Sequence, residues 1–158
     1  MQKPTITVRL KPYLREFLIC KLQEDANCIS RINIIGAILE PLVAYLPKNE
    51  PLPKPHPDDF TFEIPTVFNL LNTKHHTVYV PEYNQKIFAR ILRMYFYEIF
   101  FNYMDDKVRY KDEIKDCIFL FCSDYNITFN QIKFDTLSKS YYRYRQKKKR
   151  YNLSLTCP

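Results

Sequence analysis

Residues Asp135–Arg150 read DTLSKSYYRYRQKKKR, and this stretch decides how the rest of the chain is interpreted. No Pro or Gly interrupts it, and Asp135 suits an N-cap because its carboxylate can accept hydrogen bonds from free backbone N–H groups at a helix start. Leu137, Tyr141 and Tyr144 recur at helical spacing and form one stripe. The stretch therefore predicts a C-terminal helix that packs on the protein body along this stripe.

The other sides of this predicted helix carry the net charge of the chain. The whole chain has 24 Lys+Arg and 17 Asp+Glu, and from Thr136 onward there are seven basic residues and no acidic one. Residues 1–135 therefore hold 17 of each (24 − 7 = 17 basic residues), so the net charge of +7 belongs to the last helix. A neutral body with one strongly basic helix is typical of a protein that binds a polyanion.

A solvated basic tail is the alternative interpretation of this stretch. Its tyrosines count against that alternative, because disordered basic tails are poor in aromatic residues. We expect the helix to bind double-stranded DNA, with phosphate contacts that weaken as salt rises. Phosphate contacts are expected from Lys139, Arg143, Lys147 and Arg150, base contacts from Tyr142, Arg145 and Gln146, and a further contact from Lys149.

Length and composition indicate a globular protein. A chain of 158 residues forms one domain, or two very small ones that share a core. Hydrophobic residues make up 46% of it, and no run of about 18 apolar residues is present to span a membrane. The first residues, MQKPTITVRL, lack the apolar core of a signal peptide, so we expect a cytoplasmic location in a bacterial host cell.

Several common enzyme motifs are missing from the sequence. The single glycine, Gly36, excludes a G-x-G-x-x-G dinucleotide loop and a Walker loop, and no G-x-S-x-G elbow is present. The five cysteines are irregularly spaced and odd in number, which favours reduced thiols over disulfides or a zinc site. We therefore expect no catalytic activity, no cofactor and no metal.

The N-terminal segment predicts a strand followed by two helices. Residues Thr5–Leu10 alternate strictly between polar and apolar types, as in a half-buried strand. Pro12 suits the first turn of a helix that continues over Tyr13–Leu22. A second helix is expected from Ser30 to about Leu46, with a kink or split at Pro41.

This order, opening with ITVRL, resembles the ribbon-helix-helix family of DNA-binding proteins. The resemblance covers residues 4–46. It implies that two such strands, one from each subunit of a dimer, pair into a ribbon that enters the major groove. Thr5, Thr7 and Arg9 would then contact bases. The alternative is an ordinary strand that pairs with a later strand of the same chain.

A Pro-rich segment divides the sequence into the predicted regions 1–46, 47–59 and 60–158. Its residues Pro47–Pro57 hold five of the eleven prolines, which predicts a stiff, extended linker. A P-x-x-P ligand for a partner protein is the alternative interpretation of this segment.

The third region begins with strands and ends with helices. Alternation predicts strands at Phe60–Ile64 and Thr77–Val80, with an apolar turn or short helix at Val67–Asn72 between them. Helices are expected at Gln85–Met104, which is apolar nearly all round, and at Lys111–Tyr125, with Thr128 capping a short turn after it. A helix, a break and a basic helix form the order of a helix-turn-helix. The fold class is therefore α+β and mostly α, with short strands in the N-terminal half and a helix-turn-helix-like ending.

The ending N-I-T…D-T-L-S-K-S-Y-Y-R-Y-R-Q-K-K-K resembles small proteins of bacteriophages and mobile elements in gut Bacteroides. We expect a non-catalytic DNA-binding protein, a transcriptional regulator or DNA-packaging factor, that forms a homo-oligomer. RNA or single strands are the second choice of target, because aromatic faces stack on unpaired bases. The alternative from another class is a protein-interaction factor, such as a virion component or an inhibitor of a host factor.

Overall fold

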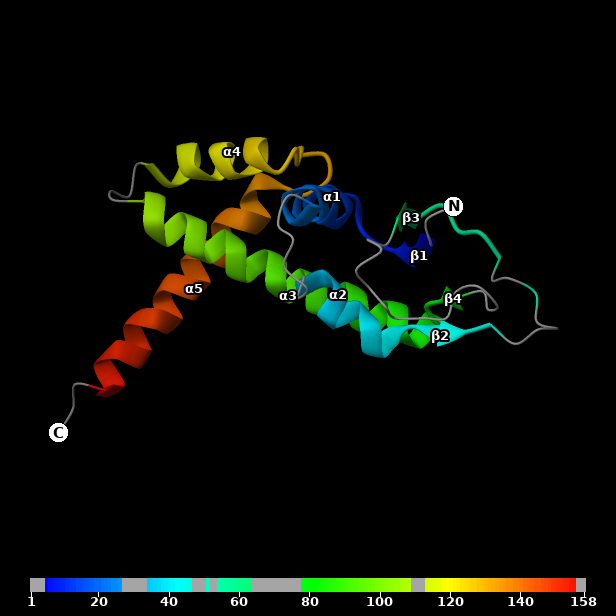
Figure 1. Cartoon of the computed structure of the whole chain (residues 1–158). Helices are drawn as coiled ribbons and strands as arrows, with labels where there is room; N and C mark the ends of the chain where they lie inside the picture. The colour runs from blue at the N-terminus through cyan, green and yellow to red at the C-terminus, as the bar shows by residue number, and fades with distance from the viewer. Residues whose placement is uncertain are drawn as a thin grey trace. The chain divides into compact units, whose positions relative to one another are not determined.

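The computed structural model describes residues 5–26, 34–46, 51, 54–63, 78–108 and 113–155. The chain divides into two compact units, Met1–Met94 and Tyr95–Pro158, and helix α3 (Glu82–Lys107) contributes to both. The elements in Figure 1 confirm the predicted α+β class, mostly helical, with short strands confined to the first unit. The boundary between the units lies within α3, whereas the sequence predicted a division at residues 47–59.

The first unit opens with the predicted strand and helix. Strand β1 (Thr5–Arg9) is followed by helix α1 (Pro12–Ala26), which begins at Pro12, where the missing N–H costs nothing. β1 pairs antiparallel with β3 (Asp59–Glu63), with Thr7 opposite Thr61. This pairing within one chain is the alternative to the intersubunit ribbon, and it places the Pro-rich segment between two elements of the same unit.

Pro41 ends the second helix earlier than predicted. Helix α2 (Ile34–Leu39) passes into a 3-10 turn, η1 (Glu40–Leu42), and Val43 is already extended at φ −84° and ψ 143°. The predicted continuation to Leu46 is wrong, because proline clashes with the preceding helical turn and lacks an N–H to bond to it. The chain instead forms β2 (Ala44–Tyr45), which pairs antiparallel with β4 (Val78–Tyr79). Ser30 and Val67–Asn72 lie outside the described residues.

The alternation read from the sequence correctly predicts the buried side of β1. Ile6 and Val8 are buried, whereas Thr5 and Thr7 are exposed. The remaining core of the first unit comes from α1, from α2 with its 3-10 turn, and from the start of α3. Its buried members include Leu14, Phe17, Leu18, Ile35, Leu39, Leu42, Phe88 and Leu92.

The second unit combines the end of α3 with α4 (Ile114–Asp124) and α5 (Phe134–Leu155). Its core is aromatic: the ring of Phe121 meets the rings of Phe96 and Phe100 edge to face, with centroids 5.7 and 5.0 Å apart. Such edge-to-face pairs are favoured by the quadrupole of the rings. Along α3 the buried residues occur every fourth position, from Phe88 to Met104. Each such step turns about 40° further round the helix, which explains why the sequence looks apolar nearly all round.

Candidate nucleic-acid interface

The break between α4 and α5 is tightly hydrogen bonded. Asn126 adopts a left-handed conformation with φ 53°, its N–H donates to the carbonyl of Ser123, and the N–H of Ile127 donates to the carbonyl of Cys122. These two bonds form a Schellman motif, which satisfies the last carbonyls of α4. Thr128 lies at the predicted N-cap position of the next turn, because its carbonyl accepts from the N–H groups of Gln131 and Ile132. The Gln131 side chain accepts from the Thr128 N–H at 3.0 Å, as in one half of a capping box.

Helix α5 is the predicted basic helix, with a shifted start. It begins at Phe134, so Asp135 lies inside the first turn and is not the N-cap that the sequence predicted. A carboxylate in a first turn still interacts favourably with the helix dipole. Asp135 is a residue type that favours the N-cap position, which is why the sequence placed the helix start there. In the structure the Lys133 carbonyl accepts from the N–H groups of Thr136 and Leu137, so the helix starts before Asp135.

The predicted apolar stripe is the side of α5 that packs. Leu137 and Tyr141 are buried, and Tyr144 is half-buried. The ring of Tyr144 stacks on Phe101 of α3, with centroids 4.4 Å apart and planes 7° from parallel. The orientation of α5 within the second unit is therefore fixed by aromatic contacts with α3.

Three side chains of α5 converge on Asp105 of α3. The Tyr141 hydroxyl donates to Asp105 Oδ1 at 3.2 Å, and the Tyr144 hydroxyl donates to Oδ2 at 2.9 Å. Lys148 Nζ lies 2.6 Å from the same Oδ2. Lys148 continues the stripe of Leu137, Tyr141 and Tyr144 by one more helical step, and this extension of the spacing was the missed indication that Lys148 faces the protein.

The environment of Asp105 keeps it charged. Burial acts to raise the pKa of its carboxyl, but the hydrogen bonds from Lys148, Tyr144 and Tyr141 outweigh burial, and the pKa is lowered. Burial, followed by the charge of Asp105, raises the pKa of Tyr141 to about 12. Lys148 stays protonated, and the carboxylate of Asp105 balances its positive charge. The other cations of α5 form no ion pair with a described residue.

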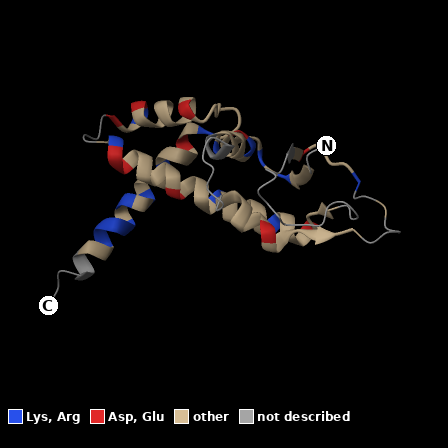
Figure 2. Ribbon diagram, in the orientation of Figure 1, with Lys and Arg blue, Asp and Glu red and all other residues tan. Residues whose placement is uncertain are grey.

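The remaining cations of α5 lie on its outer side. Five of them are exposed and form no ion pair with any described residue, namely Lys139, Arg143, Lys147, Lys149 and Arg150. Tyr142, which is 65% exposed, lies among them, and Gln146 is half-buried. Arg145 is also half-buried and lies over the ring of Tyr141, at 5.8 Å from its centroid. Figure 2 shows how Lys and Arg gather along the C-terminal half of α5. The five exposed cations together with Tyr142 and Gln146 are called the outer surface of α5 below.

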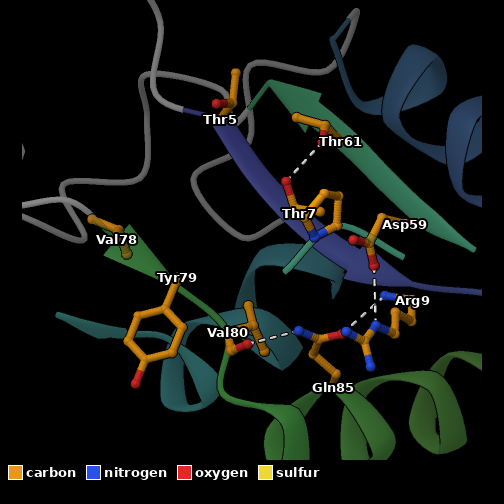
Figure 3. Close-up of a pocket in the computed structure, with 10 residues that line it drawn as sticks. Thr5, Thr7, Arg9, Asp59, Thr61, Val78, Tyr79, Val80 and Gln85 are labelled. Carbon is orange, nitrogen blue, oxygen red and sulfur yellow. Dashed lines mark hydrogen bonds and ion pairs between the residues drawn. The ribbon is translucent and has the colours of Figure 1, made fainter. Parts of the chain in front are cut away.

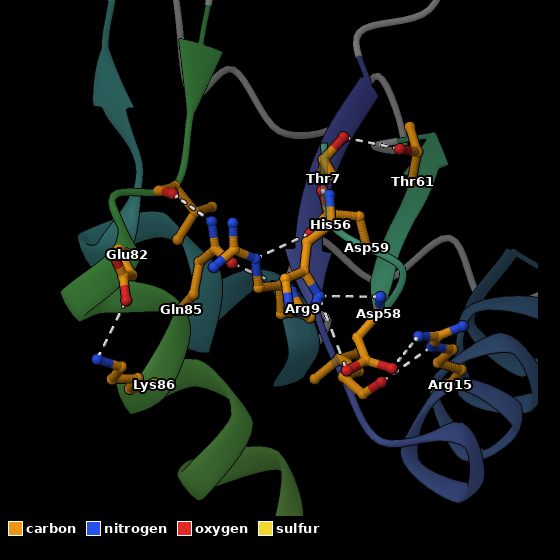
Figure 4. Close-up of polar contacts among 12 residues, drawn as sticks. Thr7, Arg9, Arg15, His56, Asp58, Asp59, Thr61, Glu82, Gln85 and Lys86 are labelled. Carbon is orange, nitrogen blue, oxygen red and sulfur yellow. Dashed lines mark hydrogen bonds and ion pairs between the residues drawn. The ribbon is translucent and has the colours of Figure 1, made fainter. Parts of the chain in front are cut away.

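Two of the three N-terminal candidates, Thr7 and Arg9, have side-chain partners within the first unit. The Thr7 and Thr61 hydroxyls are 2.7 Å apart, and Arg9 Nε donates to Asp59 Oδ1 at 3.1 Å (Figure 3). The Arg9 N–H donates to Gln85, and Asp59 also accepts from the N–H of His56 (Figure 4). β1 thus brings Thr5, Thr7 and Arg9 to one side of the sheet, but the charge of Arg9 is already balanced.

The described part of the chain shows neither a metal-binding cluster nor a membrane-spanning helix. No group of three or more His, Cys, Asp or Glu residues in it is arranged to hold a metal. Within the same residues, no helix combines the length and the apolar character needed to cross a membrane. Cys117 and Cys122 are buried free thiols, while Cys28 and Cys157 lie outside this part. Comparisons with protein-family models, curated proteins and solved structures give no match.

Proposed function

We propose that this protein binds double-stranded DNA, without catalysis, through the outer surface of α5. The observation that carries the proposal is the set of five exposed cations that have no ion-pair partner among the described residues. Phosphates attract such a surface because each contact releases counterions from the nucleic acid. We further propose that the protein acts as a homo-oligomer in transcriptional regulation or DNA packaging for a phage or mobile element.

The packing of α5 supports a recognition role over a simple charged tail. Aromatic contacts and the Asp105 cluster hold one side of the helix, so the opposite side is presented in a fixed orientation. Tyr142 and Gln146 lie among the cations, where they can reach base edges while the cations contact phosphates. An α-helix about 10–12 Å wide matches the major groove of B-DNA, which is about 12 Å wide.

A salt titration of binding to a random duplex, followed by fluorescence anisotropy, tests the proposal. We expect the change of Lys139, Arg143, Lys147 and Arg150 to Ala to reduce the slope of log affinity against log salt by about 3 to 4. A matched control changes four exposed cations elsewhere, Lys11, Lys54, Arg90 and Lys115, to Ala and removes the same total charge. Equal loss of binding in both variants would show that only net charge matters, and absence of binding at low salt would contradict the proposal.

An interaction with an acidic protein is the second candidate. It is favoured by apolar side chains exposed on α4 of the same unit: Phe119 is 45% exposed and Leu120 is 54% exposed. The ring of Phe119 meets Phe129 and Phe134, with centroids 5.0 and 5.9 Å apart, so the exposed aromatic group continues toward the start of α5. In the titration above, this candidate predicts no duplex binding by the intact chain.

A further inference from the structure

The first unit contains a pocket between β1 and β4 that the proposed DNA contact does not use. Its volume is about 430 Å³, and it opens beside the outer side of the β1–β3 sheet (Figure 3). Residues from β1, β3, β4 and the first turn of α3 line it, so the pocket covers the outer face of the β1–β3 sheet as well as the edge of β1. Its lining includes Thr5, Thr7, Arg9, Thr61, Val78, Tyr79 and Gln85.

The main chain of β1 presents an open strand edge to this pocket. The Leu10 N–H donates to the Asp58 carbonyl at 3.3 Å, toward β3, whereas the Arg9 N–H donates to Gln85 Oε1 at 3.2 Å, away from β3. Backbone groups alternate in direction along an antiparallel pair, so those of Thr5 and Thr7 also point away from β3. Among the described residues, none forms a hydrogen bond with the outward backbone groups of Thr5 and Thr7.

Gln85 closes one end of the pocket in the way that a peptide group would. Its Oε1 accepts from the backbone of Arg9 on β1, and its Nε2 donates to the carbonyl of Val80, just after β4, at 2.9 Å (Figure 3). One carboxamide therefore joins the two edges with the donor and acceptor of a single backbone amide. Beyond Gln85, the lining of the pocket continues along Thr7, Thr5 and Val78.

We propose that this pocket binds an extended peptide segment, which adds a strand to the outer edge of β1 and continues the bridge that Gln85 begins. Main-chain pairing with an exposed edge is an established mode of peptide recognition, in which backbone hydrogen bonds supply affinity. The charges in the pocket define the peptide further. Arg9 is paired with Asp59, and Val78 and Tyr79 are half-buried, so the complementary segment is uncharged, with β-branched or small polar side chains.

The test begins with a displayed library of random eight-residue peptides selected on the intact chain. A selected peptide is then synthesised with a fluorophore, and its affinity is measured by anisotropy. Thr7→Pro removes the outward N–H of β1 but leaves the bonds to β3, because proline is tolerated where the N–H faces away from the ladder. Thr7→Val keeps this N–H and removes only the hydroxyl. We expect Thr7→Pro to weaken binding about tenfold or more and Thr7→Val to change it less than about threefold.

A change on the peptide provides a second measurement that does not depend on how Thr7→Pro folds. N-methylation of alternate amides of the selected peptide removes its backbone donors, and we expect one alternate set to abolish binding while the other set does not. In the ¹⁵N-labelled intact chain, the amide resonances of Thr5, Thr7 and Val78 should shift on binding. Failure to select any peptide, equal binding by folded Thr7→Pro and Thr7→Val variants, or indifference to both sets of N-methylation would overturn the proposal.

Discussion

The β1–β3 sheet and helix α5 each carry an arginine on their outer side. The two arginines differ in whether a carboxylate balances their charge. On the β1–β3 sheet, Arg9 lies 3.1 Å from the carboxylate of Asp59. On α5, Arg143 is exposed and forms no ion pair with a described residue. The two side chains belong to the same residue type and both point outward, but only Arg143 adds net positive charge to its surroundings.

Whether the charge of an arginine is balanced by a carboxylate affects the binding of a polyanion more than it affects the stability of the fold. The Arg9–Asp59 ion pair is half-buried and still partly screened by water, so it contributes about 1 kcal/mol or less to stability. If Arg9 approached a phosphate of DNA, the carboxylate of Asp59 would approach it too, and the net charge of the pair would be near zero. Within the described part of the chain, Lys148 is the one cation of α5 with such a partner, Asp105. The comparison therefore favours α5 over β1 as the surface for the proposed nucleic-acid contact.

The comparison requires that α5 be held on the protein by its apolar side. Leu137 is fully buried, so Leu137→Ala should lower the free energy of unfolding by about 2–5 kcal/mol through lost burial and the cavity left behind. Leu120→Ala on α4 is the matched control, because that leucine is 54% exposed, and it should cost less than about 1 kcal/mol. Chemical denaturation measures both values. Similar small losses would mean that α5 is not anchored by this stripe.

Asp105 does for Lys148 what Asp59 does for Arg9, although the Lys148–Asp105 pair is the more exposed of the two. Asp105→Asn keeps one acceptor and removes the charge, and we expect a loss of about 1 kcal/mol at neutral pH, mainly from the tyrosine hydrogen bonds. Because the pKa of Asp105 is lowered by folding, the stabilisation is present above its ordinary pKa of 3.8 and is lost as pH falls through the lowered value.

Denaturation of the intact chain and of Asp105→Asn at a series of pH values measures this difference. The gap between the two stabilities should be constant near neutral pH and shrink below about pH 4. Asp106→Asn is the control, because Asp106 is the next residue of α3 and is exposed. A gap that persists undiminished at low pH would show that the charge of Asp105 is not what stabilises the cluster.

Local patterns were sufficient to predict most of the elements. The alternation at β1, the apolar spacing on α4 and α5 and the position of Pro12 each depend on residues close in sequence. Pro41 was recognised as a break, but a two-residue strand such as β2 has too few residues to show a period. Its pairing with β4 depends on tertiary contacts that sequence spacing does not contain.

The candidate sites were harder to predict because charge balance is a long-range property. The sequence shows that Arg9 and Lys148 are basic, but not that Asp59 and Asp105, about 50 and 43 residues away along the chain, neutralise them. The five exposed cations of α5 were predicted correctly as outward-facing, since no acid follows Asp135 on the same helix. A uniformly basic helix is thus easier to interpret than a single arginine on a strand.

The smallest expected effect separates the two surfaces most directly. Arg9→Ala and Arg143→Ala each remove one positive charge, so any general effect of net charge on DNA binding is equal in both. We expect Arg143→Ala to reduce the salt slope by about 0.9, the value for one phosphate contact, and Arg9→Ala to leave it unchanged, because β1 makes no such contact. The measurement is the salt titration by fluorescence anisotropy on a single duplex. Asp59→Asn, which frees Arg9 from its partner, is the informative control: if this variant and Arg9→Ala shift the slope in opposite directions by similar amounts, then β1 also lies against the DNA and its ion pair only weakens that contact.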